Sequence, residues 1–212
     1  MAEQIDGTGI RRWIAEAARV LSEQRAYLTE LDSAVGDADH AVNMDRGFQA
    51  AVARVAALPA DAAPGAILRA VGAAVMSGVG GTSGPLWGTA FRRAGQQAGD
   101  SPSLDGSALA AVLETVVQAM RQLGGAQVGD KTMIDALAPA AEAMRSRVGA
   151  GASLTAALAA ACDAAEVGAQ STMQLQARKG RASYLGERSI GHLDPGAASA
   201  VYILRALETA VG

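Results

Sequence analysis

Residues 10–31 read IRRWIAEAARVLSEQRAYLTEL, and their apolar positions recur at the three- and four-residue intervals of an α-helix. The residues that share this apolar face are Ile10, Trp13, Ile14, Ala17, Leu21, Leu28 and Leu31. The opposite face carries charged residues, which are Arg12, Glu16, Arg19 and Glu23. A helix with one apolar stripe buries that stripe against other elements of the fold. The segment therefore predicts one long helix of an α-helical bundle.

The same periodicity recurs along the rest of the chain, and the alternation typical of strands is hard to find. Further helices are expected at about 41–58, 64–77, 86–98, 107–123, 133–148, 154–176 and 195–211. Half of the 212 residues are hydrophobic but only 3% are aromatic, and alanine, the best helix former, supplies much of the apolar content. We predict an all-α fold in which residues 1–212 form one domain with eight helices.

Composition excludes several classes of protein. A net charge of −3 argues against a nucleic-acid-binding surface. The single cysteine, Cys162, cannot form an intrachain disulfide and is interpreted as a small core residue. The N-terminus lacks the pattern of a secretory signal, and Arg69 and Asp163 interrupt the longest apolar runs, so no membrane span is expected. These features predict a soluble, cytoplasmic protein.

The loops between the expected helices differ in character. Helices joined by short loops lie antiparallel, so alternate loops fall at the same end of a bundle. Three alternate loops contain ordinary turn residues, and these are 59–63, 99–106 and 149–153. The chemically suggestive segments all fall in the other four, which are 32–40, 78–85, 124–132 and 178–194. This alternation predicts a composite site at one end of the bundle.

The loop at 32–40 contains three carboxylates, from Asp32, Asp37 and Asp39. Asp32 lies at the end of a helix, where the partial negative charge of the helix dipole disfavours another anion. Asp37 and Asp39 are two residues apart, so an extended backbone would point both carboxylates the same way. Clustered oxygen ligands of this kind suit Mg²⁺, whose shell is often shared with phosphate. The alternative is that Asp39 caps the next helix and Asp37 ends a turn, with His40 making an ordinary structural hydrogen bond.

The next two loops offer groups that suit an anion and an apolar ring. Glycines at 80, 81 and 84, with Thr82 and Ser83, precede a helix, where backbone N–H groups and the helix dipole favour an anion; an ordinary N-cap is the alternative. Residues 124–132 lie one insertion, Asp130, away from a P-loop, but a P-loop requires a preceding strand and that assignment is rejected. Asp130 or Thr132 is expected to cap the next helix, and Met133 offers a polarizable surface to a purine.

The loop at 178–194 is basic. Its cationic residues are Arg178, Lys179, Arg181, Arg188 and His192. Arginine binds phosphate in bidentate fashion, so this loop could offset phosphate charge. The alternative is a solvated basic loop that ends in an N-cap, Asp194, followed by Pro195.

Four strings of the sequence, in this order and spacing, resemble a known family over nearly the full chain. The strings are Gly36-Asp-Ala-Asp-His40, Gly80-Gly-Thr-Ser-Gly-Pro-Leu86, Gly129-Asp-Lys-Thr-Met133 and Gly180-Arg-Ala-Ser-Tyr-Leu-Gly-Glu-Arg-Ser-Ile-Gly-His-Leu-Asp-Pro-Gly196. They are similar to the L subunits (DhaL) of dihydroxyacetone kinases. The resemblance implies an eight-helix antiparallel up-and-down barrel with a nucleotide site at one end.

The resemblance also implies roles for individual residues. Two Mg²⁺ ions would be held by three metal ligands, which are Asp32, Asp37 and Asp39. ADP or ATP would be contacted by His40, Ala41, Val42, Asn43, Thr82, Ser83, Gly124, Met133, Arg181, Asp194, Pro195 and Gly196. The sequence departs from the family pattern at Ala41, where a Gly is usual, and at Gly125, where a Lys is common. No residue of this chain is expected to be a catalytic acid, base or covalent phosphate carrier.

The family resemblance further implies the partners and the reaction. The chain would present a phosphoryl group from a Mg-bound nucleotide to a dihydroxyacetone molecule held on a separate K subunit, since phosphoryl transfer needs mainly positioning and charge neutralisation. A stand-alone L chain is typical of the phosphotransferase-system form, in which tightly bound ADP is rephosphorylated by a phosphohistidine-carrying M subunit. The alternatives are an ATP-dependent kinase subunit for a related small ketose, and a nucleotide-responsive protein that docks to a transcription regulator. A helical bundle whose polar loops serve only as caps is the third interpretation.

Overall fold

The structure, a computed structural model, describes residues 4–212, most of which are helical. The α-helices are α1 (Gly7–Glu23), α2 (Arg25–Val35), α3 (His40–Ala56), α4 (Pro64–Gly78), α5 (Ser83–Ala98), α6 (Gly106–Gly124), α7 (Met133–Gly149), α8 (Leu154–Ser171) and α9 (Pro195–Val211). The 3₁₀ segments are η1 (Thr172–Gln174) and η2 (Arg181–Ser189), and the strands are β1 (Ile5–Asp6) and β2 (Ser103–Leu104).

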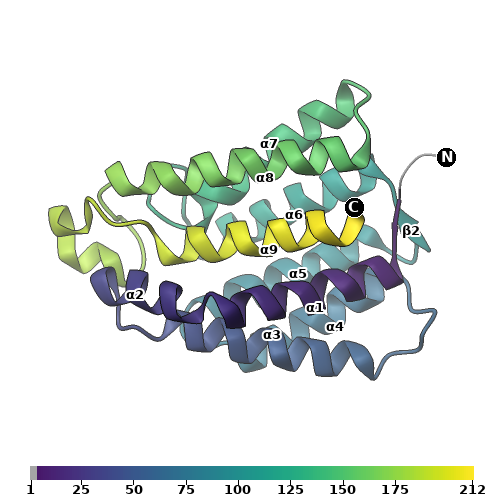
Figure 1. Cartoon of the computed structure of the whole chain (residues 1–212), viewed down its shortest axis with the longest axis horizontal. Coiled ribbons are helices and arrows are strands. Elements are labelled where there is room, and N and C mark those ends of the chain that lie inside the picture. The colour runs from purple at the N-terminus through teal and green to yellow at the C-terminus, as the bar shows by residue number, and fades with distance from the viewer. Residues whose placement is uncertain (1–3) are drawn as a thin grey trace.

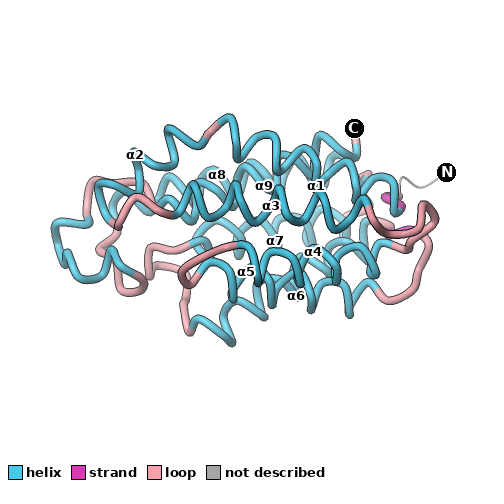
Figure 2. The backbone as a smooth tube through the Cα atoms, turned by 90° about the horizontal axis from the view of Figure 1, so that it is seen from below, coloured by secondary structure: helices cyan, strands magenta, loops and turns pink. Residues whose placement is uncertain are grey.

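Eight of these helices form a closed ring. In the described part of the chain α1 packs against α3, each later helix packs against the next, and α9 returns to contact α1 (Figure 1). The helices run lengthwise with their loops gathered at the two ends (Figure 2). The predicted all-α fold is confirmed. No helix within residues 4–212 combines the length and apolar character needed to cross a membrane.

The first predicted helix is divided in two. The chain breaks at Gln24, which ends α1 and precedes α2, and α2 lies outside the ring against α3, α9 and η2. The run Ser22-Glu23-Gln24-Arg25 is polar, so the helix has no apolar side chain here to pack against the rest of the barrel. The helix is interrupted at this point. After this break α2 lies at one end of the barrel (Figure 1).

Three smaller predictions are also corrected. The helix expected at 154–176 ends at Ser171, where η1 takes over, and the loop expected at 178–194 contains η2. The short strands β1 and β2 pair antiparallel, with Ile5 opposite Leu104; two-residue strands are too short to show alternation in a sequence. They lie at the end of the barrel opposite α2 (Figure 1).

The core uses few aromatic side chains, but those it has are concentrated. The ring of Phe91 lies 5.7 Å from Trp13, 6.0 Å from Phe48 and 5.7 Å from Trp87, measured between centroids. Elsewhere alanine and glycine allow close helix packing. A Cβ at Gly72 of α4 would lie 2.7 Å from the backbone of α5. Cys162 is buried in this core as predicted, and burial raises the pKa of its thiol to about 12.

Candidate functional site

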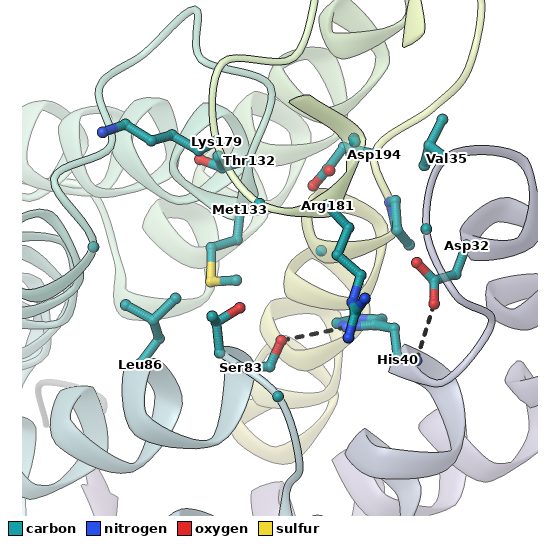
Figure 3. A pocket seen from close by; sticks show the side chains of 18 of the residues that line it. Asp32, Val35, His40, Ser83, Leu86, Thr132, Met133, Lys179, Arg181 and Asp194 are labelled. Carbon is teal, nitrogen blue, oxygen red and sulfur yellow. Dashed lines mark hydrogen bonds between the residues drawn. The ribbon is translucent and has the colours of Figure 1, made fainter. Parts of the chain in front are cut away.

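A cavity of about 260 Å³ is lined by the end of α2 and the loop that follows it. Helix α2 lies at one end of the barrel (Figure 1). Each of the four loops predicted to meet contributes to the lining of the cavity, together with the first residues of α5, α7 and α9 (Figure 3). The expected composite arrangement is therefore present. The alternation of short loops was enough to predict it, because antiparallel neighbours return every second loop to the same end.

The three aspartates of the first loop converge on this cavity. One carboxylate oxygen from each of Asp32, Asp37 and Asp39 lies within 4.8 Å of one from each of the others. Asp39 occupies the N-cap position of α3, but its side chain makes no capping hydrogen bond, so the carboxylate is not used by the helix. Like charges this close are unfavourable without a cation. The group offers the hard oxygen ligands that Mg²⁺ prefers, and these residues fit such an ion.

Neighbouring backbone holds Asp32 in place. Its Oδ2 accepts a hydrogen bond from the backbone N–H of His40, 3.1 Å away. A Cβ at Gly36 would lie 2.1 Å from Asp32 Oδ1, so only glycine leaves room for the carboxylate. Ala38, between the other two aspartates, has a φ of 63°, a conformation that L side chains rarely adopt. The loop thus keeps an unfavourable backbone conformation at Ala38 in an arrangement that brings the three carboxylates together.

Cations from the basic loop reach the same place. Arg181, in η2, forms an ion pair with Asp37 at 2.9 Å and extends toward the side of the cavity where Asp32 and His40 lie (Figure 3). Lys179 also lines the cavity, and its Nζ is 3.5 Å from where a Cβ of Gly125 would be. The other cations that the sequence offered, at 178, 188 and 192, are not among the lining residues.

His40 is fixed between two hydroxyl groups. Its Nε2 is 2.9 Å from Ser199 Oγ, and its Nδ1 is 3.4 Å from Ser83 Oγ. The Ser199 hydroxyl donates to the carbonyl of Gly196, so it is best placed to accept from a protonated Nε2. Burial lowers the pKa of His40, although Asp32 and Asp39 raise it, and the ring is therefore neutral at pH 7. Nothing in the sequence pattern pointed to Ser199, which lies within an alanine-rich stretch.

The Gly-rich loop leads into the N-terminus of α5. Gly81 has a φ of 64°, and Thr82 stands at the N-cap without a capping side-chain hydrogen bond. The Thr82 hydroxyl is exposed and Ser83 is the first residue of the helix. The positive pole of the helix dipole and this hydroxyl together suit an anion at this wall of the cavity.

The opposite wall is apolar. Met133, the first residue of α7, lies with Leu86 on the side of the cavity away from Asp32 (Figure 3). Met120 and Ile134 complete this surface. Thr132, one of the two caps considered from the sequence, caps α7 in a capping box with Asp135. A flat aromatic ring can be buried against such a surface.

Lys131 is a buried structural residue, which the sequence analysis did not predict. Its side chain is 1% exposed, and Nζ donates to the carbonyls of Thr172 and His192. Burial lowers the pKa of this ammonium group, opposed by Asp194 and Asp135. These hydrogen bonds connect the segment 172–194 to the start of α7. No local pattern distinguishes such a lysine from a solvated one.

Asp194 closes the base of the cavity. Its carboxylate accepts from the N–H of Ala197 and caps α9, the role that the alternative interpretation of the sequence gave it, while its own N–H donates to Thr172 Oγ1. Burial raises the pKa of Asp194 to about 7, against the effects of the Ala197 hydrogen bond and of Lys131. The group therefore holds its proton well above the usual pH range of an aspartate.

Most of the site residues named from the sequence line this one cavity. They are Asp32, Asp37, Asp39, His40, Asn43, Thr82, Ser83, Gly124, Met133, Arg181, Asp194, Pro195 and Gly196. Ala41 and Val42 were also named, but they do not line the cavity. Ala41 packs into the core and Val42 is exposed, because the turn of α3 rotates both away from the face shared by His40 and Asn43.

Comparison with known proteins gives consistent results. The DAK2 domain matches residues 34–209. The chain is 44% identical to the "PEP-dependent dihydroxyacetone kinase, ADP-binding subunit DhaL" of Escherichia coli K12, over 96% of each chain. It is 38% identical to D-erythrulose kinase of Mycolicibacterium smegmatis, over 97% of this chain and 36% of that protein. The crystal structure of dihydroxyacetone kinase from C. freundii with AMP-PNP and Mg²⁺ matches 95% of this chain and 33% of its own, with a TM-score of 0.71 and 27% identity.

Proposed function

The chain belongs to the DAK2 domain family, and from this premise we propose that it is the ADP-binding subunit of a dihydroxyacetone kinase. The proposal is supported by the 44% identity to a subunit of that name, which extends over 96% of both chains. It is also supported by the fold shared with a dihydroxyacetone kinase that was solved with a nucleotide analogue and Mg²⁺.

The observation that carries the proposal is the convergence of Asp32, Asp37 and Asp39 at a cavity large enough for part of a nucleotide. These carboxylates would hold Mg²⁺, and we propose two ions. Bound Mg²⁺ supplies positive charge that neutralises the phosphates during transfer. The N-terminus of α5 would bind a phosphate through backbone N–H groups, including that of Ser83, and through the hydroxyl of Thr82. The apolar wall around Met133 would receive the adenine.

The neutral His40 and the buried Asp194 contribute differently. With Nε2 bonded to Ser199, the Nδ1 atom of His40 is an acceptor, and the Ser83 hydroxyl 3.4 Å away is its donor. Asp194 shapes the base of the cavity through its cap of α9. We propose that both groups have structural roles, and we assign the chain no catalytic acid or base.

The acceptor would be supplied by another subunit. We propose that a K-type subunit holds dihydroxyacetone and that a phosphohistidine-carrying M subunit regenerates the nucleotide in place, as in the phosphotransferase-system form. The similarity to D-erythrulose kinase makes a four-carbon ketose the second candidate acceptor. The identity to the E. coli subunit, 44%, is higher than the 38% identity to the erythrulose kinase, and this favours the separate-subunit form.

Calorimetry tests the nucleotide site. We expect ADP to bind in the presence of Mg²⁺ and the affinity to fall severely in Asp37→Ala. Asp163→Ala removes an exposed carboxylate that pairs with Arg205 outside the cavity, and it serves as the matched control. Equal ADP affinity in wild type and Asp37→Ala would refute the proposed metal site. Native mass spectrometry of the purified protein then separates the two nucleotide modes, because a retained ADP indicates the coenzyme form.

A further inference from the structure

Asn43 lies one turn after His40 on α3 and lines the cavity with 8% of its surface exposed. The two ends of its side-chain amide have opposite chemistry, since Oδ1 only accepts hydrogen bonds and Nδ2 only donates them. A phosphate oxygen can be bound only by the Nδ2 end. The orientation of this amide therefore decides whether Asn43 attracts or repels a nucleotide.

Arg46, one further turn along α3, decides that orientation. Its Nη2 lies 2.7 Å from Asn43 Oδ1. A guanidinium group has donors and no acceptor, so the amide atom that faces it must be the oxygen. Nδ2 is then left on the other side of the amide. Within residues 4–212 no hydrogen bond from Nδ2 to a protein acceptor is found, and the donor remains available to a ligand.

A second hydrogen bond holds the guanidinium itself. Arg46 Nε donates at 2.7 Å to the carbonyl of Gly78, at the end of α4, where helix carbonyls lack partners of their own. The following loop passes directly against the amide, because a Cβ at Gly80 would lie 2.8 Å from Asn43 Oδ1. The amide is thus enclosed between Arg46 and the backbone of the Gly-rich loop.

We propose that Arg46 is a positioning residue of the nucleotide site, which holds the Asn43 amide with Nδ2 directed at the phosphates. This inference rests on the proposed function. Arg46 is exposed and does not line the cavity, so it acts through Asn43 rather than on the nucleotide. Without the guanidinium the amide can turn by half a rotation and present its oxygen to the phosphates. At metal sites, removing a group that orients a ligating side chain costs about tenfold or more in affinity, and we expect an effect of this size here.

A double-mutant cycle measured by calorimetry with Mg²⁺ and ADP tests the proposal. The four proteins are wild type, Arg46→Met, Asn43→Ala and the double variant. We expect Arg46→Met to weaken ADP binding about tenfold in the wild-type background and less than about twofold in the Asn43→Ala background. Arg54→Met removes an exposed arginine from the last turn of the same helix and should leave the affinity unchanged.

The cycle separates this proposal from a general effect of charge or folding. If Arg46→Met weakens binding equally in both backgrounds, or in neither, the proposal is wrong although the nucleotide site stands. A wild-type protein that binds no ADP overturns the proposed function and this inference with it. A second measurement does not depend on how the arginine variant folds. The side-chain NH₂ signals that disappear in Asn43→Ala should shift in wild type when Mg²⁺ and ADP are added, and unshifted signals would overturn the proposal.

Discussion

Replacing Arg181 by methionine should change metal binding and nucleotide binding in opposite directions. Arg181 neutralises Asp37 through their 2.9 Å ion pair, and so it competes with a divalent cation for one of the three carboxylates. The same guanidinium extends into the cavity where the phosphates are proposed to lie (Figure 3). Arg181→Met removes both interactions and leaves the aspartates unchanged.

The effect on Mg²⁺ binding follows from the exposure of the ion pair, and the effect on ADP binding follows from the strength of a charged hydrogen bond. The Arg181 and Asp37 side chains are 68% and 35% exposed, so solvent screens the pair and limits it to about 1 kcal/mol. Loss of this competitor should tighten the binding of Mg²⁺ alone by up to about fivefold. A hydrogen bond from arginine to a charged phosphate contributes about 1.5 to 3 kcal/mol. ADP binding at saturating Mg²⁺ should therefore weaken by roughly 10- to 150-fold.

Calorimetry gives both affinities, first with Mg²⁺ alone and then with ADP at saturating Mg²⁺. The matched control is Arg188→Met, which removes an exposed arginine of the same segment, η2, that does not line the cavity. If both affinities fall in Arg181→Met, the arginine orders the acidic loop instead of competing with the cation. An unchanged ADP affinity would show that Arg181 does not contact the phosphates.

Three further predictions follow from the structure. Gly36→Ala places a Cβ 2.1 Å from Asp32 Oδ1, so calorimetry should show Mg²⁺-dependent ADP binding weakened by about tenfold or more. Full affinity would show that the carboxylate need not hold its orientation. Asp194 has a pKa of about 7 in the folded protein, above its unfolded value, so its stabilisation is present at low pH and is lost as pH rises from about 4 to 7. Urea unfolding should therefore show wild type losing about 2 kcal/mol relative to Asp194→Asn between pH 5 and 7, and a constant difference would contradict this. Phe91→Ala should lower the free energy of unfolding in urea by about 4 kcal/mol, because it removes the ring that contacts three others. Tyr184→Ala, at a side chain that is 87% exposed, should change stability by less than about 0.5 kcal/mol. A loss below about 2 kcal/mol for Phe91→Ala would mean that the core collapses around the gap.

Helix ends were predictable where local chemistry marks them. Asp194 and Pro195 predicted the start of the last helix, and the structure has that helix at Pro195–Val211 with the Asp194 cap in place. The break at Gln24 was missed. It separates α1, which joins the ring, from α2, which packs against α3 and also against α9 and η2, two segments distant in the chain.

The sequence alone determined the helical class and the end of the barrel at which polar groups gather, because helical period and loop length are local properties. Tertiary structure decided which atoms meet there. Arg181 forms an ion pair with Asp37, and Ser199 is hydrogen-bonded to His40. Lys131 donates hydrogen bonds to two carbonyls that are distant in the chain. Each contact depends on how far a helix is rotated about its own axis and how deeply a loop lies against its neighbours. Both are set by packing of the complete ring, and no segment carries that information by itself.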